Sequence, residues 1–212
     1  MNTTDRYITI RQLGRDEFVT SRSRFIGYAC PCETEEEALS FLQEIRESHR
    51  DAKHHCYAYI IGLNSGVMRY SDDGEPGGTA GLPIMDVMRA QGIVNCCVVV
   101  VRYFGGILLG TGGLVRAYTQ GCKIALQAAG VVRMELTAHY LCDVPYSAWD
   151  SVLHAAESLP VHIIHPEYAA SVTFTLAARA SDAEHILDVL TNVTARHLEY
   201  VPAEEAFEPW EI

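Results

Sequence analysis

The sequence lacks a hydrophobic run long enough to cross a membrane. A membrane-spanning helix needs roughly 18 or more apolar residues, whereas the longest run here, CCVVVV at 96–101, has the length of a buried strand. The opening MNTTDRYITI has no basic segment followed by an apolar one, as a secretory signal would have. We therefore expect a cytoplasmic protein that does not engage a membrane.

The sequence also lacks the paired cysteines that form the disulfide bonds of small secreted domains. It has seven cysteines, an odd number, and Cys96 and Cys97 are adjacent inside the apolar run. This usage is typical of reduced thiols in the cytoplasm. The spacing of Cys30-Pro-Cys32 is too short for a usual zinc pair, so we expect no metal there.

Positive charge is almost absent from the last third of the chain. The net charge is −11, and residues 135–212 hold 2 Lys or Arg against 13 Asp or Glu, whereas residues 1–134 hold 14 of each. Such an asymmetry indicates two domains with different partners. We predict separately folding domains at 1–133 and 134–212. The acidic domain would repel RNA and face solvent or a basic protein.

The hydrophobic pattern of residues 134–212 predicts an α+β domain. Its order is β-α-β-β-α-β, typical of a ferredoxin-like plait. A hairpin is expected at Pro166-Glu167, and Ser181 with Glu184 has the spacing of a helix capping box. RHLEYV is expected to form the last strand. Proteins with this fold have many different functions, so the fold alone does not identify the function.

The pattern of the first domain is also α+β. Alternating residues predict strands in YITIRQL and in FVTSRSRFIGYAC, and further strands near 55–62, 66–71 and 96–103. Helices are expected after Thr34, from Pro83 onward, and over 114–128. The whole chain is thus predicted to be a two-domain α+β protein.

Glycines gather in two loops. Ten of the sixteen lie between residues 74 and 113, and each loop leads into a predicted helix, whose free N–H groups favour anions. Neither loop has the lysine of GxxxxGK[ST], so a P-loop is not expected. Val115 stands at the last glycine position of GxGxxG, which argues against a dinucleotide site.

Two other groupings have both a functional and a structural interpretation. Asp72, Asp73 and Glu75 could hold Mg²⁺, but the same residues suit a solvated turn whose carboxylates accept local N–H groups. His54-His55-Cys56 could pair a base with a thiol, but adjacent strand residues point to opposite faces, and CYAYII favours Cys56 as core. No GxSxG signature occurs. We expect no catalytic residue, metal or cofactor.

Two long motifs point to a family. YSDDGEPGGTAGLPI at 70–84 and VVVVRYFGGILLGTGGLVRAY at 98–118 resemble the diagnostic core of the IMPACT family, in its bacterial YigZ-like form. The likeness covers most of residues 18–128. It implies a first domain like domain 2 of ribosomal protein S5 and a ferredoxin-like second domain like domain V of elongation factor G. It also implies a link to translation control, without an established catalytic activity.

The resemblance implies a binding surface built from the two glycine-rich loops. Gly77 and Leu82 depart from the family, where Ser and a basic residue are frequent, and each removes a polar contact. The predicted binding residues are Lys53, His54, Arg69, Asp72, Asp73, Glu75, Thr79, Arg102, Tyr103, Arg116 and Tyr118. The predicted loop-forming glycines are Gly74, Gly78, Gly81, Gly105, Gly106, Gly110 and Gly113.

Three interpretations of these loops stay open. The first is a surface for RNA or a ribosome-associated protein, with Tyr103 and Tyr118 stacking on bases. The second is structural: Asp72 or Asp73 pairs with Arg102 or Arg116 and braces the loops. The third is a small-molecule or phosphate-ester enzyme that uses the mixed Asp/Glu/Arg patch. The sequence does not choose between RNA and protein as the ligand.

Overall fold

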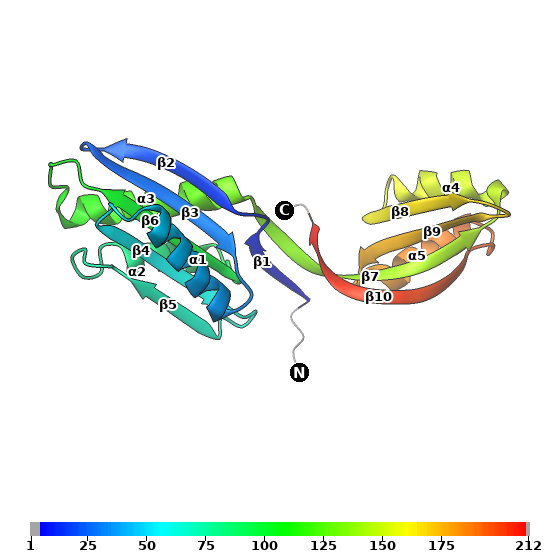
Figure 1. Cartoon of the computed structure of the whole chain (residues 1–212). Coiled ribbons are helices and arrows are strands. Elements are labelled where there is room, and N and C mark those ends of the chain that lie inside the picture. The colour runs from blue at the N-terminus through cyan, green and yellow to red at the C-terminus, as the bar shows by residue number, and fades with distance from the viewer. Residues whose placement is uncertain (1–4, 211–212) are drawn as a thin grey trace. The chain divides into compact units, whose positions relative to one another are not determined.

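The structure, a computed structural model, describes residues 5–210. Over this range the chain is α+β, with two five-stranded sheets and five helices (Figure 1). It divides into two compact units, Tyr7–Arg133 and Met134–Trp210, and the second also includes Asp5 and Arg6. The predicted α+β class with two units is confirmed. That each unit folds when expressed alone stays a prediction.

The N-terminal unit is a sheet with helices on both faces. The strand order is β2-β3-β6-β4-β5, and each neighbouring pair is antiparallel. β1 (Arg6–Ile10) pairs instead with β7 of the second sheet. The remaining elements are β2 (Gly14–Thr20), β3 (Ser23–Pro31), α1 (Glu35–Ser48), β4 (His54–Ile61), β5 (Val67–Ser71), α2 (Gly81–Ala90), β6 (Cys96–Tyr103) and α3 (Gly110–Ala129).

The central strand β6 explains the apolar run CCVVVV. Val98 and Val100 belong to a core that includes residues of α2 and α3, whereas Val99 and Val101 pack with residues of α1. Because both faces of the strand are covered, both sets of alternating side chains must be apolar. The alternation then places Arg102 on the side of α2 and α3, and Tyr103 on the side of α1.

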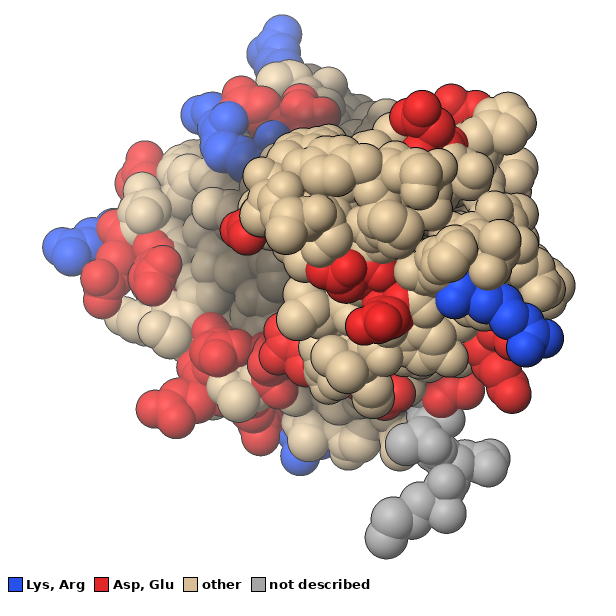
Figure 2. Space-filling model, turned by 90° about the vertical axis from the view of Figure 1, so that its right-hand side faces the viewer, with Lys and Arg blue, Asp and Glu red and all other residues tan. Residues whose placement is uncertain are grey.

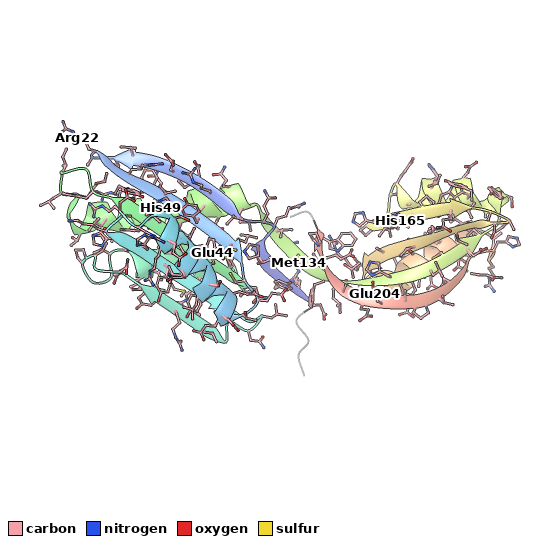
Figure 3. The ribbon with its side chains drawn as sticks, in the orientation of Figure 1. Arg22, Glu44, His49, Met134, His165 and Glu204 are labelled. Atoms are coloured by element: carbon pink, nitrogen blue, oxygen red, sulfur yellow. The ribbon has the colours of Figure 1, made fainter. Side chains whose placement is uncertain are left out.

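One predicted strand of this unit is wrong. FVTSRSRFIGYAC is not continuous but forms the antiparallel hairpin β2–β3, in which Thr20 pairs with Ser23. Ser21 and Arg22 form the turn with φ of 45° and 62°, and Arg22 lies at the hairpin tip (Figure 3). A two-residue hairpin turn of type I′ needs positive φ at both positions, which Asn and Gly usually supply. Ser-Arg carries no such signal.

Both helices that follow the glycine-rich loops begin earlier than predicted. α2 begins at Gly81, so Pro83 lies within its first turn, where its missing N–H costs little. α3 begins at Gly110 and not at 114, so Gly112 and Gly113 are helical. Glycine is a poor helix former, which explains why the sequence pattern placed the start after them.

The second unit has the predicted β-α-β-β-α-β order. Its elements are β7 (Val131–Val144), α4 (Tyr146–Ala156), β8 (Val161–Tyr168), β9 (Val172–Arg179), α5 (Ala183–Val193) and β10 (Glu199–Trp210). β7 lies between β9 and β10, and β8 forms the other edge beside β9, as in a ferredoxin-like plait. Trp149 and Phe174 anchor its core, with ring centroids 5.2 Å apart.

Two local predictions in this unit are wrong. Pro166-Glu167 is not a hairpin turn but lies inside β8, at a register shift between Ile164 and Glu167. Proline is tolerated there because a bulge leaves a ladder position unpaired. The expected capping box also fails: Asp182 is the N-cap of α5 and makes no side-chain cap, and the Ser181 hydroxyl donates to the Asp182 carboxylate at 3.1 Å.

The cysteine side chains are mostly buried, and most of the charged side chains lie on the surface. All seven cysteines are free thiols, and all except Cys30 are buried. Asp and Glu side chains are scattered over the face drawn in Figure 2, with fewer Lys and Arg between them. Among the helices of residues 5–210, none combines the length and hydropathy of a membrane span.

Candidate functional site

Asp72 organises the first glycine-rich loop. Its Oδ1 accepts the backbone N–H groups of Ala80 and Gly81, each at 2.9 Å, and its Oδ2 accepts that of Gly78 at 2.8 Å. These contacts satisfy the start of α2 in the way that an N-cap side chain does. The carboxylate is therefore engaged by its own loop, as the solvated-turn interpretation of the three acids expected.

Asp73 ties the same loop to two other elements. Its Oδ2 accepts the backbone N–H of His55 at 2.6 Å, and Arg46 of α1 approaches Oδ1 at 3.5 Å. The Asp73 carbonyl accepts the Nδ1–H of His54 at 2.8 Å. The acids do brace the loop, but the predicted pairing of Asp72 or Asp73 with Arg102 or Arg116 is wrong.

The acid that meets Arg102 is Glu75. Its Oε1 accepts Nη1 of Arg102 and the hydroxyl of Tyr118, both at 2.7 Å. All three side chains are buried, with exposed fractions of 8%, 5% and 0%. Burial holds the pKa of the Tyr118 hydroxyl well above its usual range, and the nearby Glu75 carboxylate raises it further, so Tyr118 stays a donor.

Burial also rules out one expected role. Tyr118 packs edge-to-face against Phe25, with ring centroids 5.4 Å apart, and has no exposed surface. It therefore has no ring face to offer a base, and the expectation that it stacks on one is wrong. The mixed-charge patch expected around Arg102 is likewise a buried ion pair.

Arg102 keeps an unused donor in this buried setting. Its guanidinium lies between the rings of Phe25 and Phe104, 5.5 and 5.4 Å from their centroids. Its Nε is buried and has no hydrogen-bond partner among the described residues. A buried donor without a partner costs about 1–3 kcal/mol.

Arg102 lines a hollow of about 400 Å³, which we call the Arg102 hollow. Lys53, His54 and Glu75 contribute its other charged or polar walls, and Gly110 and Thr111 bring the N-terminus of α3 to its rim. No side chain caps α3, and its first turn has no acidic residue. The positive end of the helix dipole therefore reaches the hollow without local neutralisation.

Exposed apolar side chains border the same hollow. Phe104 and Leu108 line it, with exposed fractions of 47% and 86%. The 104–109 loop is held against the β2–β3 hairpin, because a Cβ on Gly105 would lie 2.0 Å from the Arg22 backbone. Sequence reasoning missed Phe104 and Leu108. Their signal was apolar residues in a loop, directly after a strand that ends in Arg102-Tyr103.

The structure brings some of the predicted residues together and separates others. Lys53, His54, Glu75 and Arg102 share the hollow. Arg69 is exposed on β5 and donates to the Met68 carbonyl, and Thr79 is buried and donates to the Pro76 carbonyl. Arg116 is exposed on α3 outside the hollow.

Tyr103 belongs to a different cluster, on the α1 side. Its hydroxyl donates to Asp51 at 3.0 Å and lies 2.8 Å from Nδ1 of His49. Nε2 of His49 lies 2.7 Å from the Tyr28 hydroxyl, and His49 lies near the end of α1 (Figure 3). Burial lowers the pKa of His49, and nearby His55 adds to this effect. A neutral His49 then donates from Nδ1 and accepts at Nε2.

Within residues 5–210, no group of three or more His, Cys, Asp and Glu side chains is arranged to hold a metal ion. Cys56 lies in the core, and burial raises the pKa of its thiol well above the usual range. The core interpretation of Cys56 therefore agrees with its position.

Comparison with known proteins covers nearly the whole chain. Residues 21–126 match the Impact N-terminal domain. IMPACT family member YigZ of Escherichia coli is 34% identical over 87% of this chain and 91% of that protein, and an IMPACT family member of Haemophilus influenzae is 37% identical over 84% and 87%. YvyE of Bacillus subtilis is 45% identical over 61% of this chain, and the match spans only 60% of that relative.

A solved structure described as the crystal structure of a hypothetical protein is 31% identical. It covers 95% of this chain and 99% of its own, with a TM-score of 0.60. The sequence motifs, the matched domain and these relatives agree. The chain belongs to the IMPACT family, a family related in general to the regulation of translation, and is a YigZ-like member of it.

Proposed function

We propose that this chain is a translation-associated binding protein that takes RNA at the Arg102 hollow. The observation that carries the proposal is Arg102, a buried arginine that lines the hollow and whose Nε has no hydrogen-bond partner among the described residues. Arginine is suited to phosphate because its donors match phosphate oxygens in number and geometry. Family membership supports the connection with translation.

The surroundings of Arg102 suit a nucleotide better than a bare anion. Lys53 and the uncapped start of α3 add positive potential for a phosphate. Phe104 has one ring face towards Arg102 and is 47% exposed, so a base can stack on the outer part of its ring. Single-stranded RNA is commonly bound by this combination of phosphate contacts and aromatic stacking.

The acidic unit would have a separate task. With 2 Lys or Arg against 13 Asp or Glu, residues 135–212 repel RNA and attract a basic surface. We propose a basic protein, in the cytoplasm, as the partner of this unit. The charge asymmetry would thus direct RNA to the N-terminal unit.

Binding is favoured over catalysis because the loop carboxylates are already occupied. Asp72 accepts three backbone N–H groups, and Glu75 accepts from both Arg102 and Tyr118. These acids are thus held in contacts that shape the loop, which favours a binding role over the phosphate-ester enzyme considered from the sequence.

The test is co-sedimentation of the purified full chain with ribosomes, with and without ribonuclease. Lys53→Gln should weaken sedimentation, and Lys123→Gln, an exposed lysine on α3 outside the hollow, should not. Binding that survives ribonuclease but depends on Lys53 would identify a protein surface as the ligand and contradict the RNA proposal. Binding that is indifferent to Lys53 would contradict the site.

A further inference from the structure

We infer that the Arg102 hollow selects a terminal phosphate, a phosphomonoester on a nucleotide, over the phosphodiesters inside an RNA strand. This inference rests on the proposed function, since it specifies which part of an RNA the hollow takes. The same chemistry is offered by an RNA end and by a free mononucleotide. Three independent features of the hollow carry it: its depth, its charge and its apolar rim.

The first feature is depth. Arg102 is only 5% exposed but lines the hollow, so its guanidinium is reached only by a group that projects into the hollow. A phosphodiester carries the strand away on both sides and would have to fold sharply to bring its oxygens there. A phosphomonoester has a single ester link and three free oxygens, and it enters end-on.

The second feature is the local charge. The charges of Arg102 and Glu75 cancel in their 2.7 Å ion pair. What remains is Lys53 together with the start of α3, whose dipole contributes roughly half a positive charge. The sum of roughly +1.5 matches a phosphomonoester, which carries about −1.5 to −2 at neutral pH. A phosphodiester, with a single negative charge, would leave part of it uncompensated.

The third feature is the rim. Phe104 and Leu108 are exposed beside a hollow of about 400 Å³, which lies at the small end of ligand pockets, roughly 300–1,000 Å³. A pocket of this size takes one nucleotide and not a folded segment of RNA. The exposed rim accommodates the flat, partly apolar face of a base while the phosphate lies deeper.

The inference is tested with four probes and the full chain. The probes are uridine 5′-monophosphate, uridine, and a five-nucleotide oligouridylate with either a 5′-phosphate or hydroxyls at both ends. Dissociation constants are measured by calorimetry, and amide NMR identifies the residues that respond. Arg102→Lys keeps the charge opposite Glu75 but removes the planar guanidinium. Lys53→Gln removes the rim charge, and Lys123→Gln is the control.

The expected result is that the phosphate-bearing probes bind at least about 10-fold more tightly than their hydroxyl counterparts, since charge-assisted contacts are lost without the phosphate. Arg102→Lys and Lys53→Gln should each remove most of that preference, and Lys123→Gln none of it. Unchanged NMR dispersion in Arg102→Lys would show that the loss is not unfolding.

The alternative results separate the two proposals. Equal binding of the two oligonucleotides, weakened by Lys53→Gln, would overturn the terminal-phosphate inference and leave RNA binding standing. Tight binding of the mononucleotide without either oligonucleotide would support the phosphate chemistry and refute the RNA proposal. Failure of all four probes would refute both.

Discussion

The buried pair between Arg102 and Glu75 makes a quantitative prediction about stability. In Arg102→Met the apolar stem is retained and the cation is lost, which leaves the Glu75 carboxylate, in a residue only 8% exposed, with the Tyr118 hydroxyl as its remaining donor among the described residues. Removing one partner of a buried ion pair typically costs about 3–5 kcal/mol. We expect Arg102→Met to lower the free energy of unfolding by an amount in that range.

The matching double variant distinguishes the pair from simple packing. Arg102→Met combined with Glu75→Gln also removes the buried negative charge, and the amide oxygen that replaces the carboxylate can still accept from the Tyr118 hydroxyl. Uncharged replacements of a buried pair are often close to neutral, so the double variant should recover about 2 kcal/mol or more relative to Arg102→Met.

Urea unfolding of the three proteins, followed by circular dichroism, measures both differences. A single variant within about 1 kcal/mol of the wild type, in the range of an exposed pair, would refute the buried pair. So would a double variant that is less stable than Arg102→Met, because the lost stability would then come from packing and not from the uncompensated carboxylate.

Three further predictions concern the elements around the site. In an NMR titration, the pKa of His49 should lie below the ordinary value of 6.5, and a midpoint above 6.5 would contradict this. Because protonation of His49 then favours the unfolded chain, the stabilising contribution of neutral His49 is present above about pH 6.5 and is lost as the pH falls. Asp72→Ala leaves three N–H groups unpaired and should cost at least about 1–2 kcal/mol in urea unfolding; an unchanged transition would mean that Asp72 does not organise the loop. Gly105→Ala should lower the melting temperature because the added Cβ would lie 2.0 Å from the Arg22 backbone, whereas Gly77→Ala meets nothing within 4 Å and should be tolerated. Equal melting temperatures of the two variants would refute the close approach at Gly105.

Local sequence patterns predicted much of the fold. The β6 run predicted a buried strand, and the order of elements after residue 134 predicted the plait. The Ser21-Arg22 turn was missed because neither residue commonly adopts positive φ. Pro166 was misplaced because a proline at a bulge and one in a turn leave similar patterns.

The site was only partly predictable, for a physical reason. The sequence correctly predicted that each of the two glycine-rich loops leads into a helix, because this is a local property. That Glu75, and not Asp72 or Asp73, meets Arg102 depends on how the 72–80 loop folds, with Asp72 turned to its own backbone. The strand alternation that separates Tyr103 from Arg102 was available in the sequence, but the resemblance grouped both on one surface.

The most direct test of RNA binding at the Arg102 hollow is an amide NMR titration of the ¹⁵N-labelled full chain with single-stranded RNA bearing a 5′-phosphate. RNA bound in the hollow should give the largest shifts at Lys53, Phe104, Gly110 and Thr111, which line it. Shifts confined to the groove between α2 and α3, at Val87 and Thr119, or to residues 134–210, would contradict it.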